Sequence, residues 1–336
     1  MRSIQGRVHA VPKPDRRMKD KILITGATGF VGSHLLQMAL TQDRKVICPA
    51  RNKNAASDVQ APVIDSIGRN TDWQAPLLQV HTVVHCAARV HVMNDTETDP
   101  LAAFREVNLY GTLRLAEQAA AAGVSQFIYL SSVKVNGEMT EAEQAFTEND
   151  EPQASDPYGI SKQEAEAALM ELGQRTGMTI TIIRPPLVYG KGVAANFLSL
   201  LIWVKKQIPL PLGSIHNQRS FVFVKNLCDF ILHCVQDPRA FNQVFLISDG
   251  KDMSTTELLQ EAAKALNVRS SLLPFPAGLI RLAANLIGKK NIADRLCQSL
   301  RVDSSKARTH MQWNPPYSVQ QGLSESAASL ISTNNK

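Results

Sequence analysis

The sequence contains no apolar run of about 18 residues, the length with which a helix spans a membrane. Its five cysteines include no Cys-x-x-Cys pair, and its His and Cys residues do not stand together at the spacing of metal ligands. It also lacks internal repeats and low-complexity runs. We therefore predict no membrane span, no bound metal, and reduced thiols in a cytoplasmic protein.

A basic body is also missing, although the net charge of the 336 residues is +6. Residues 1–20 hold six Lys and Arg against two Asp, so +4 of this charge lies in one short segment and only +2 in the other 316 residues. A nearly neutral body argues against a groove for nucleic acid, and we predict no such partner. The segment has no apolar centre of a secretory signal, and we expect residues 1–18 to be a disordered basic tail.

Short apolar runs alternate with helical patterns through the first half of the chain. Continuous apolar strands separated by helices are typical of a parallel sheet that is covered on both faces. We predict an α/β fold with a Rossmann-type doubly wound parallel sheet, which binds ligands at the carboxyl ends of its strands. The runs that indicate strands are residues 21–25, 45–50, 62–65, 82–88, 126–132 and 178–190.

The pattern becomes irregular after the sixth run. Two short apolar runs, 219–224 and 243–248, indicate a strand pair around a helix. The amphipathic segment 277–290 could lie on a membrane surface, but such a helix more commonly covers a core, which is what we expect here. We predict a nucleotide-binding domain over residues 19–190 and a smaller mixed substrate lobe over 191–330, interleaved with the first.

Three glycines follow the first strand in the stretch TGATGFVG. They stand three apart, at the point where the chain passes from a strand to a helix. Glycine there lets the backbone approach a pyrophosphate, and the N–H groups of the helix then face the anion. We predict that this turn binds a dinucleotide cofactor through Gly26, Gly29, Phe30, Val31 and Gly32.

The end of the second strand bears on which dinucleotide binds. An acidic residue there would hold the ribose 2′-hydroxyl of NAD, whereas an arginine suits the 2′-phosphate of NADP. The chain has Arg51, followed by Lys53, and no acid. We predict NADP as the cofactor, with NAD as the second choice. We expect Asp65, after the third strand, to accept a hydrogen bond from the adenine amino group.

Tyr158 and Lys162 lie four residues apart at the start of a helical segment, so both side chains fall on one face. The ammonium group favours the phenolate and should lower the pKa of the tyrosine, which can then exchange a proton with an alcohol or carbonyl oxygen. Ser132 ends the fifth strand at the same rim as the glycine turn, where its hydroxyl can hold the substrate oxygen. Together the three residues predict hydride transfer at a carbon that bears oxygen.

Six motifs carry a resemblance to a known family: TGATGFVGSH, VNLYGT, YLSSVKVNG, DPYGISKQEAE, RPPLVYG and RSFVFVKNL. Over about residues 20–325 the chain resembles the extended short-chain dehydrogenase/reductase family, and most closely its nucleotide-sugar epimerase, dehydratase and reductase branch. This resemblance implies a nucleotide-sugar substrate. It also implies a homodimer formed through the helices near residues 101–122 and 157–173.

The resemblance implies roles for individual residues. Tyr158 would be the acid and base, Lys162 would hold the nicotinamide ribose, and Ser132 would be the catalytic hydroxyl, with Ser131 as the weaker choice. An arginine fork also suits a pyrophosphate on chemical grounds. The further implied contacts are Ala87, Ala88 and Asn108 with the cofactor, and Asn196 and Arg219 with the nucleotide diphosphate of the substrate.

The residues leave the reaction open within this branch. Dehydration at C4 and C6 is disfavoured, because family dehydratases have Thr-Asp-Glu where this chain has Ser132-Val133-Lys134. The lack of an acid at Arg51 favours a 4-keto-sugar reductase over a UDP-hexose 4-epimerase. Several motifs also resemble bacterial enzymes that reduce UDP-linked 4-keto-6-deoxy-N-acetylhexosamines for O-antigen or capsule sugars. A non-catalytic NADP sensor and a reductase of small ketones or steroids are more distant alternatives.

Overall fold

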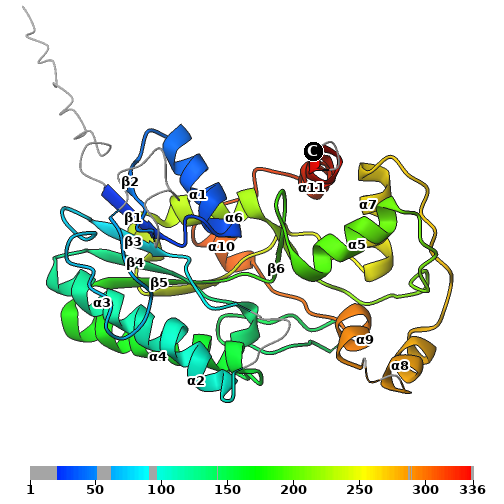
Figure 1. The fold of residues 1–336 in the computed structure, drawn as a ribbon, viewed down its shortest axis with the longest axis horizontal. Coiled ribbons are helices and arrows are strands. Elements are labelled where there is room, and N and C mark those ends of the chain that lie inside the picture. The colour runs from blue at the N-terminus through cyan, green and yellow to red at the C-terminus, as the bar shows by residue number, and fades with distance from the viewer. Residues whose placement is uncertain are drawn as a thin grey trace, which may run out of the picture.

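A computed structural model describes residues 21–50, 62–90, 97–141, 143–286, 288 and 290–333. A parallel sheet occupies the centre of the larger part of the molecule, on the left of Figure 1. Its strands stand in the order β2-β1-β3-β4-β5-β8, and each neighbouring pair is parallel. They are β1 (Lys21–Thr25), β2 (Lys45–Ile47), β3 (Thr82–His85), β4 (Gln126–Leu130), β5 (Thr179–Arg184) and β8 (Gln243–Leu246).

Helices cover both faces of the sheet, because both faces of its strands are apolar. Successive side chains of a strand point to opposite faces, so Ile24 of β1 belongs to one core and Leu23 to the other. The predicted α/β class and doubly wound sheet are confirmed. The covering helices are α1 (Phe30–Thr41) and α6 (Val224–Cys234) on one face, and α3 (Thr112–Ala121) and α4 (Pro157–Thr176) on the other; α2 (Pro100–Arg105) and a π-helical turn (Glu106–Gly111) lead into α3.

The run 178–190 is not one strand, as predicted, because two prolines interrupt it. β5 ends at Arg184, and Pro185 and Pro186 follow. Proline has no N–H to donate to a strand ladder, so the chain leaves the main sheet there. The remainder forms β6 (Leu187–Tyr189).

The two predicted strands of the second half and the helix between them are present, but the strands do not pair with each other. β7 (Phe221–Phe223) pairs in parallel with β6, while β8 extends the main sheet beside β5. The apolar run around β8 is too short to indicate which strand β8 pairs with. The run 62–65 contributes only an isolated bridge between Ala50 and Val63.

The remaining helices form a group that we call the C-terminal lobe, on the right of Figure 1. It has a core of its own, which includes Leu212, Ile215 and Leu259. Among the described helices, none has the length and apolar character that a membrane span requires. The helices of the lobe are α5 (Ala195–Lys205), α7 (Thr255–Ala265), α8 (Ala277–Leu286), α9 (Lys290–Cys297) and α11 (Val319–Thr333), while α10 (Ser305–Thr309) lies beside β8.

Candidate active site

The turn between β1 and α1 has no room for side chains at its glycines. Gly26 has a φ of +71°, and a Cβ there would lie 2.8 Å from the backbone N of Ala87. A Cβ at Gly32 would lie 2.1 Å from the carbonyl oxygen of Gly26. Gly29 begins α1 without a side-chain cap, and no acid stands in the first helical turn. This tight turn below an uncapped helix N-terminus fits the pyrophosphate of a dinucleotide.

Asn108 fixes the loop that follows β3. Its buried amide accepts a hydrogen bond from the Arg89 N–H at 2.8 Å and donates to the Arg89 carbonyl at 3.0 Å. The N–H of Ala87 donates to the hydroxyl of Thr25 at 3.2 Å, which holds the same loop beside the glycine turn. Asn108 lies in the π-helical turn, and such turns are frequent at functional sites. Asn108 therefore positions the segment that contains Ala87 and Ala88.

Ser132, Tyr158 and Lys162 come together at the carboxyl end of β4. Ser132 lies two residues beyond Leu130, the last residue of the strand. The ammonium of Lys162 donates to the Leu130 carbonyl at 2.9 Å and lies 5.9 Å from the centre of the Tyr158 ring. The side chain of Ser132 lies close enough to Tyr158 to act on the pKa of its phenol. The three residues that the sequence selected thus form one site.

Local capping sets where α4 begins and hence where Tyr158 stands. Asp156 caps the helix by accepting the Gly159 N–H at 2.6 Å, and Pro157 occupies the first helical position. The second oxygen of Asp156 pairs with Lys134, which follows Ser132 by two residues. The carboxylate of Asp156 therefore connects the start of α4 to the segment that carries Ser132.

Burial, rather than the lysine, dominates the ionisation of Tyr158. Burial raises the pKa of its phenol to about 12, and the side chain of Ser132 acts in the opposite direction. The lowered pKa expected from Lys162 is wrong for the protein alone, because the lysine ammonium is directed at the Leu130 carbonyl and the Tyr129 ring, 4.5 Å away. Ser132 is the neighbour that favours the phenolate.

Lys162 is itself almost fully buried, at 2% exposure. Burial lowers the pKa of its ammonium from 10.5 to about 8, while Glu166 and Cys86 act in the opposite direction. Its charge in turn helps burial to lower the pKa of His85 to about 3. His85 is therefore neutral, and it hydrogen-bonds Thr25 and Thr112 as a structural residue.

We expect Lys162→Met to stabilise the fold at neutral pH. A lysine whose folded pKa lies about 2.5 below its ordinary value destabilises the fold by about 3 kcal/mol wherever the folded side chain stays protonated. The variant also loses the hydrogen bond to Leu130, which costs it roughly 1 kcal/mol of stability. The net gain in its free energy of unfolding at pH 7 is therefore about 2 kcal/mol. The penalty is full below pH 8, shrinks between pH 8 and 10.5, and is gone above.

Urea unfolding of both proteins at pH 7 and at about pH 10 measures this difference. The gain should be present at the first pH and nearly absent at the second. Lys225→Met is the matched control, because Lys225 is partly exposed and paired with Glu325, and it should show no such pH dependence. A variant that is less stable than the wild type at pH 7 contradicts the argument.

A buried ion pair that sequence reasoning missed lies directly behind the site. Glu166 of α4 and Arg184 at the end of β5 are each 5% exposed, and the Arg184 Nε donates to both carboxylate oxygens at 3.0 and 3.1 Å. The hydroxyl of Ser131 donates to Glu166, and the Arg184 Nη1 donates to Asn136 at 3.1 Å. Ser131, the weaker choice for the catalytic hydroxyl, is thereby engaged in this network and leaves Ser132 facing Tyr158. The signal in the sequence is Glu166, four residues after Lys162 on the same helix face.

The charges of Arg219 and Arg295, two cations of the C-terminal lobe, act on each other, and that of Arg295 also acts on Lys134 in the loop after β4. Backbone hydrogen bonds join Arg219 to Met253, and its guanidinium donates to the Gln298 carbonyl at 3.0 Å. Burial and the neighbouring charge of Arg295, on α9, lower the pKa of Arg219 to about 10. Neither guanidinium forms an ion pair with a carboxylate in the described part of the chain. Arg295 was not found from the sequence, since it lies 76 residues after Arg219 and in no recognised motif.

The other predicted residues are placed as follows. Phe30 and Val31 are the first residues of α1, so their backbone N–H groups stand at the helix N-terminus. Asp65 is exposed, after the bridge at Val63. Arg51 lies outside the described residues, as does the segment 1–18. Asn196 belongs to α5, but its side chain is not among those described.

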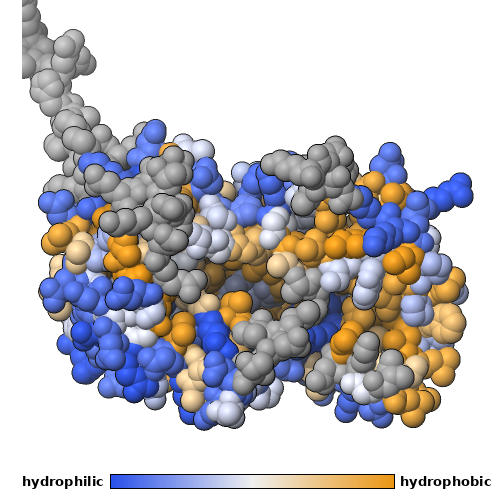
Figure 2. All heavy atoms as spheres, viewed as in Figure 1, coloured by the Kyte–Doolittle hydropathy of each residue, from blue (hydrophilic) through white to orange (hydrophobic). Residues whose placement is uncertain are grey.

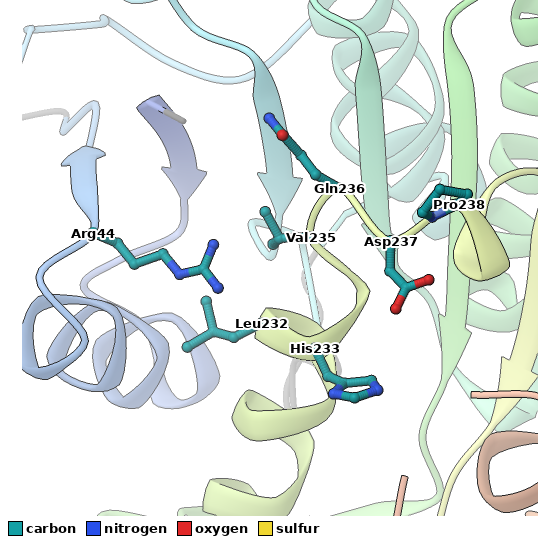
Figure 3. A pocket seen from close by; sticks show the side chains of 7 residues that line it. All are labelled: Arg44, Leu232, His233, Val235, Gln236, Asp237 and Pro238. Atoms are coloured by element: carbon teal, nitrogen blue, oxygen red, sulfur yellow. The ribbon is translucent and has the colours of Figure 1, made fainter. Parts of the chain in front are cut away.

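Two hollows in the described structure can be compared with this site as places for a ligand. The hollow in Figure 3, of about 290 Å³, is lined by Arg44, before β2, and by the end of α6, including His233. It therefore lies toward the amino ends of the strands, whereas parallel sheets bind ligands at the carboxyl ends. A larger hollow of about 840 Å³ runs along residues 136–153 and includes Asn136 of the buried network, so it borders the candidate site.

Comparison with family models matches residues 22–248 to the NAD dependent epimerase/dehydratase family, and the chain belongs to this family. It is thus an NAD(P)-dependent enzyme of the extended short-chain dehydrogenase/reductase type, as its motifs indicated. Within it, the chain is 45% identical over 324 residues to a protein of Vibrio cholerae named UDP-glucose 4-epimerase, covering 96% of this chain and 99% of the relative.

Solved structures share the fold. UDP-glucuronic acid 4-epimerase from Bacillus cereus in complex with NAD superposes with a TM-score of 0.75 at 21% identity, over 93% of this chain and 99% of that one. RMD from Pseudomonas aeruginosa complexed with NADPH superposes with a TM-score of 0.69 at 21% identity, over 92% and 99%. Both dinucleotides therefore occur on this architecture.

Proposed function

We propose that the protein is a UDP-hexose 4-epimerase that keeps one NAD bound through its reaction. The observation that carries the proposal is the assembly of Ser132, Tyr158 and Lys162 beside the glycine turn. The high identity to the Vibrio cholerae UDP-glucose 4-epimerase supports the choice of reaction. This proposal reverses the order of reductase and epimerase, and of NADP and NAD, that Arg51 suggested in the sequence.

The residues of the site would act on the 4-hydroxyl of the sugar. NAD held at the glycine turn would supply reversible hydride transfer at C4, and its positive charge would favour the phenolate of Tyr158. Tyr158 takes the proton of the 4-hydroxyl as the hydride leaves, and gives it back to the oxygen after the sugar has turned over. Ser132 donates to the same oxygen and so holds it while the carbonyl exists. Lys162 contributes a fixed positive charge behind the tyrosine.

Arg219 and Arg295 would hold the diphosphate of the substrate. The charges of two guanidinium groups that lie near each other repel, and an anion bound between them would relieve that repulsion. Gripping the sugar nucleotide by its diphosphate leaves the hexose free to turn, which a 4-epimerase requires. The lobe and the sheet are linked next to this point, where the Thr140 N–H donates to the Ser299 carbonyl at 2.9 Å.

We expect Arg219→Met to raise KM for the sugar nucleotide by roughly 10- to 100-fold with little change in kcat, since charge-assisted hydrogen bonds contribute about 1.5–3 kcal/mol of binding. Steady-state kinetics and inhibition by UDP measure the effect. Arg239→Met is the control, because Arg239 is paired with Asp237 near the hollow of Figure 3. Unchanged KM and UDP inhibition in Arg219→Met would remove Arg219 from the substrate site.

The test of the function is incubation of the purified protein with UDP-glucose, UDP-N-acetylglucosamine and a UDP-linked 4-keto sugar, each with and without added NADPH. Epimerisation without added cofactor supports the proposal. Consumption of NADPH by a UDP-linked 4-keto sugar, without epimerisation, identifies the second candidate, a 4-keto-sugar reductase, which Arg51 favours. Binding of a dinucleotide without either reaction would overturn both.

Three further properties stay proposals. All five cysteines are free thiols, which agrees with a reducing compartment such as the cytoplasm. The homodimer implied by family resemblance would use the helices near residues 101–122 and 157–173, which are α2, α3 and α4, and light scattering tests it. Residues 19–190 and 191–330 remain the proposed division into domains, with β8 as the point where the second re-enters the sheet of the first.

A further inference from the structure

Helix α8 is apolar on two opposite faces, and only one of them is covered. Ala277 and Ile280 pack against the core of the C-terminal lobe. Leu279, Leu282 and Leu286 are 56%, 59% and 80% exposed, and their spacing places them on one side of the helix. A surface helix is normally polar on its outer face, so this outer row of leucines is unexplained by packing within the chain.

Other large apolar side chains close to α8 in the chain are exposed as well. Leu273 and Phe275, just before α8, are 44% and 46% exposed, and Ile292 on the adjoining α9 is 54% exposed. Of the fifteen large apolar side chains that are exposed in the described residues, six thus lie between residues 273 and 292. We call Leu273, Phe275, Leu279, Leu282, Leu286 and Ile292 the α8 surface. Figure 2 shows hydrophobic residues at the lower right, where Figure 1 places α8.

The charge of this segment differs from that of the rest of the body. Residues 261–295 contain six Lys and Arg, one Glu and one Asp, a net charge of +4, although residues 21–336 together carry only +2. Asp294 pairs with Arg281 at 3.1 Å, and Lys264 pairs with Glu261, whereas Arg269 and Lys290 are exposed. Leucine and phenylalanine with flanking lysine and arginine are the composition of helices that lie in the interface of an anionic bilayer. Interfaces between proteins are instead depleted in lysine.

We propose that the α8 surface docks the protein on anionic phospholipid membranes. The leucine row enters the boundary between headgroups and acyl chains, with the helix parallel to the membrane, and the basic side chains meet the anionic headgroups. Docking there is reversible, because only a few side chains are inserted. It brings α9, which carries Arg295 of the candidate site, close to the membrane. The proposal is independent of which sugar reaction the enzyme performs.

Co-sedimentation of the full chain with vesicles tests this proposal. We expect binding to vesicles of equal parts phosphatidylglycerol and phosphatidylcholine, weaker binding to pure phosphatidylcholine, and release by salt. Leu282→Glu with Leu286→Glu should weaken binding by roughly tenfold or more. Leu78→Glu is the matched control, since Leu78 is a single leucine at 65% exposure on the sheet side, and it should bind like the wild type. Circular dichroism and turnover of a soluble sugar nucleotide verify that each variant is folded.

Three outcomes would overturn the proposal. The first is that the wild type does not bind the anionic vesicles. The second is that the double variant binds as well as the wild type, which would assign any binding to another segment such as the basic residues 1–20. The third is that the double variant lowers the oligomeric state in light scattering while vesicle binding is absent, which would make the α8 surface an interface between two copies.

Discussion

Replacing Tyr158 with Phe should lower kcat by roughly 10³-fold, within the range that a positioned acid or base contributes. The substitution removes one oxygen and keeps the ring, so the contact with Phe104, at 6.0 Å between ring centres, is retained. Neither the glycine turn nor Lys162 loses a neighbour that it needs for binding. Dinucleotide affinity, measured by calorimetry, should therefore stay close to that of the wild type.

The matched control is Tyr110→Phe. Tyr110 is 39% exposed and lies under the guanidinium of Arg69, so its phenol oxygen has no place in the candidate site. The kcat of Tyr158→Phe should therefore lie roughly 10³-fold below that of Tyr110→Phe. Turnover of Tyr158→Phe at the wild-type rate would remove Tyr158 from the role of acid and base. Equal losses of rate and of dinucleotide affinity would instead show that the phenol serves binding.

The parts of the site that the sequence revealed are those set by local spacing. Gly26, Gly29 and Gly32 lie within one turn, and Tyr158 and Lys162 are one helical turn apart, so their geometry follows from the strand and helix that carry them. Ser132 could be placed because strand ends of a parallel sheet share an edge. The doubly wound sheet followed for the same reason, from apolar runs alternating with helical segments.

The parts that the sequence did not reveal depend on what surrounds a residue in three dimensions. The pKa of Tyr158 follows burial, and burial cannot be read from the spacing of a tyrosine and a lysine. β8 pairs with β5 because the chain returns to the sheet edge after leaving it at Pro185, a choice that short apolar runs do not encode. The charges of Arg219 and Arg295 act on each other only because the lobe folds so as to bring distant parts of the chain near each other.

We expect Arg184→Met to be the most destabilising of the substitutions proposed here. It leaves the carboxylate of Glu166 in the interior without its partner, and removing one member of a buried ion pair costs about 3–5 kcal/mol. Arg105→Met is the matched control, because Arg105 pairs with Glu164 on the same helix α4 but both side chains are about one-third exposed. The control should cost less than about 1 kcal/mol. Urea unfolding of both variants measures the two free energies.

A second variant separates the charge pair from the shape of the site. Glu166→Gln keeps the size of the side chain and its ability to accept from Ser131, and in combination with Arg184→Met it removes both charges of the pair. The double variant should therefore be more stable than Arg184→Met alone. Equal stability of Arg184→Met and Arg105→Met would contradict the account. Because Ser131 and Asn136 flank Ser132 and both bind this pair, a fall in kcat for the folded double variant, without a change in KM, would show that the pair also positions the catalytic serine.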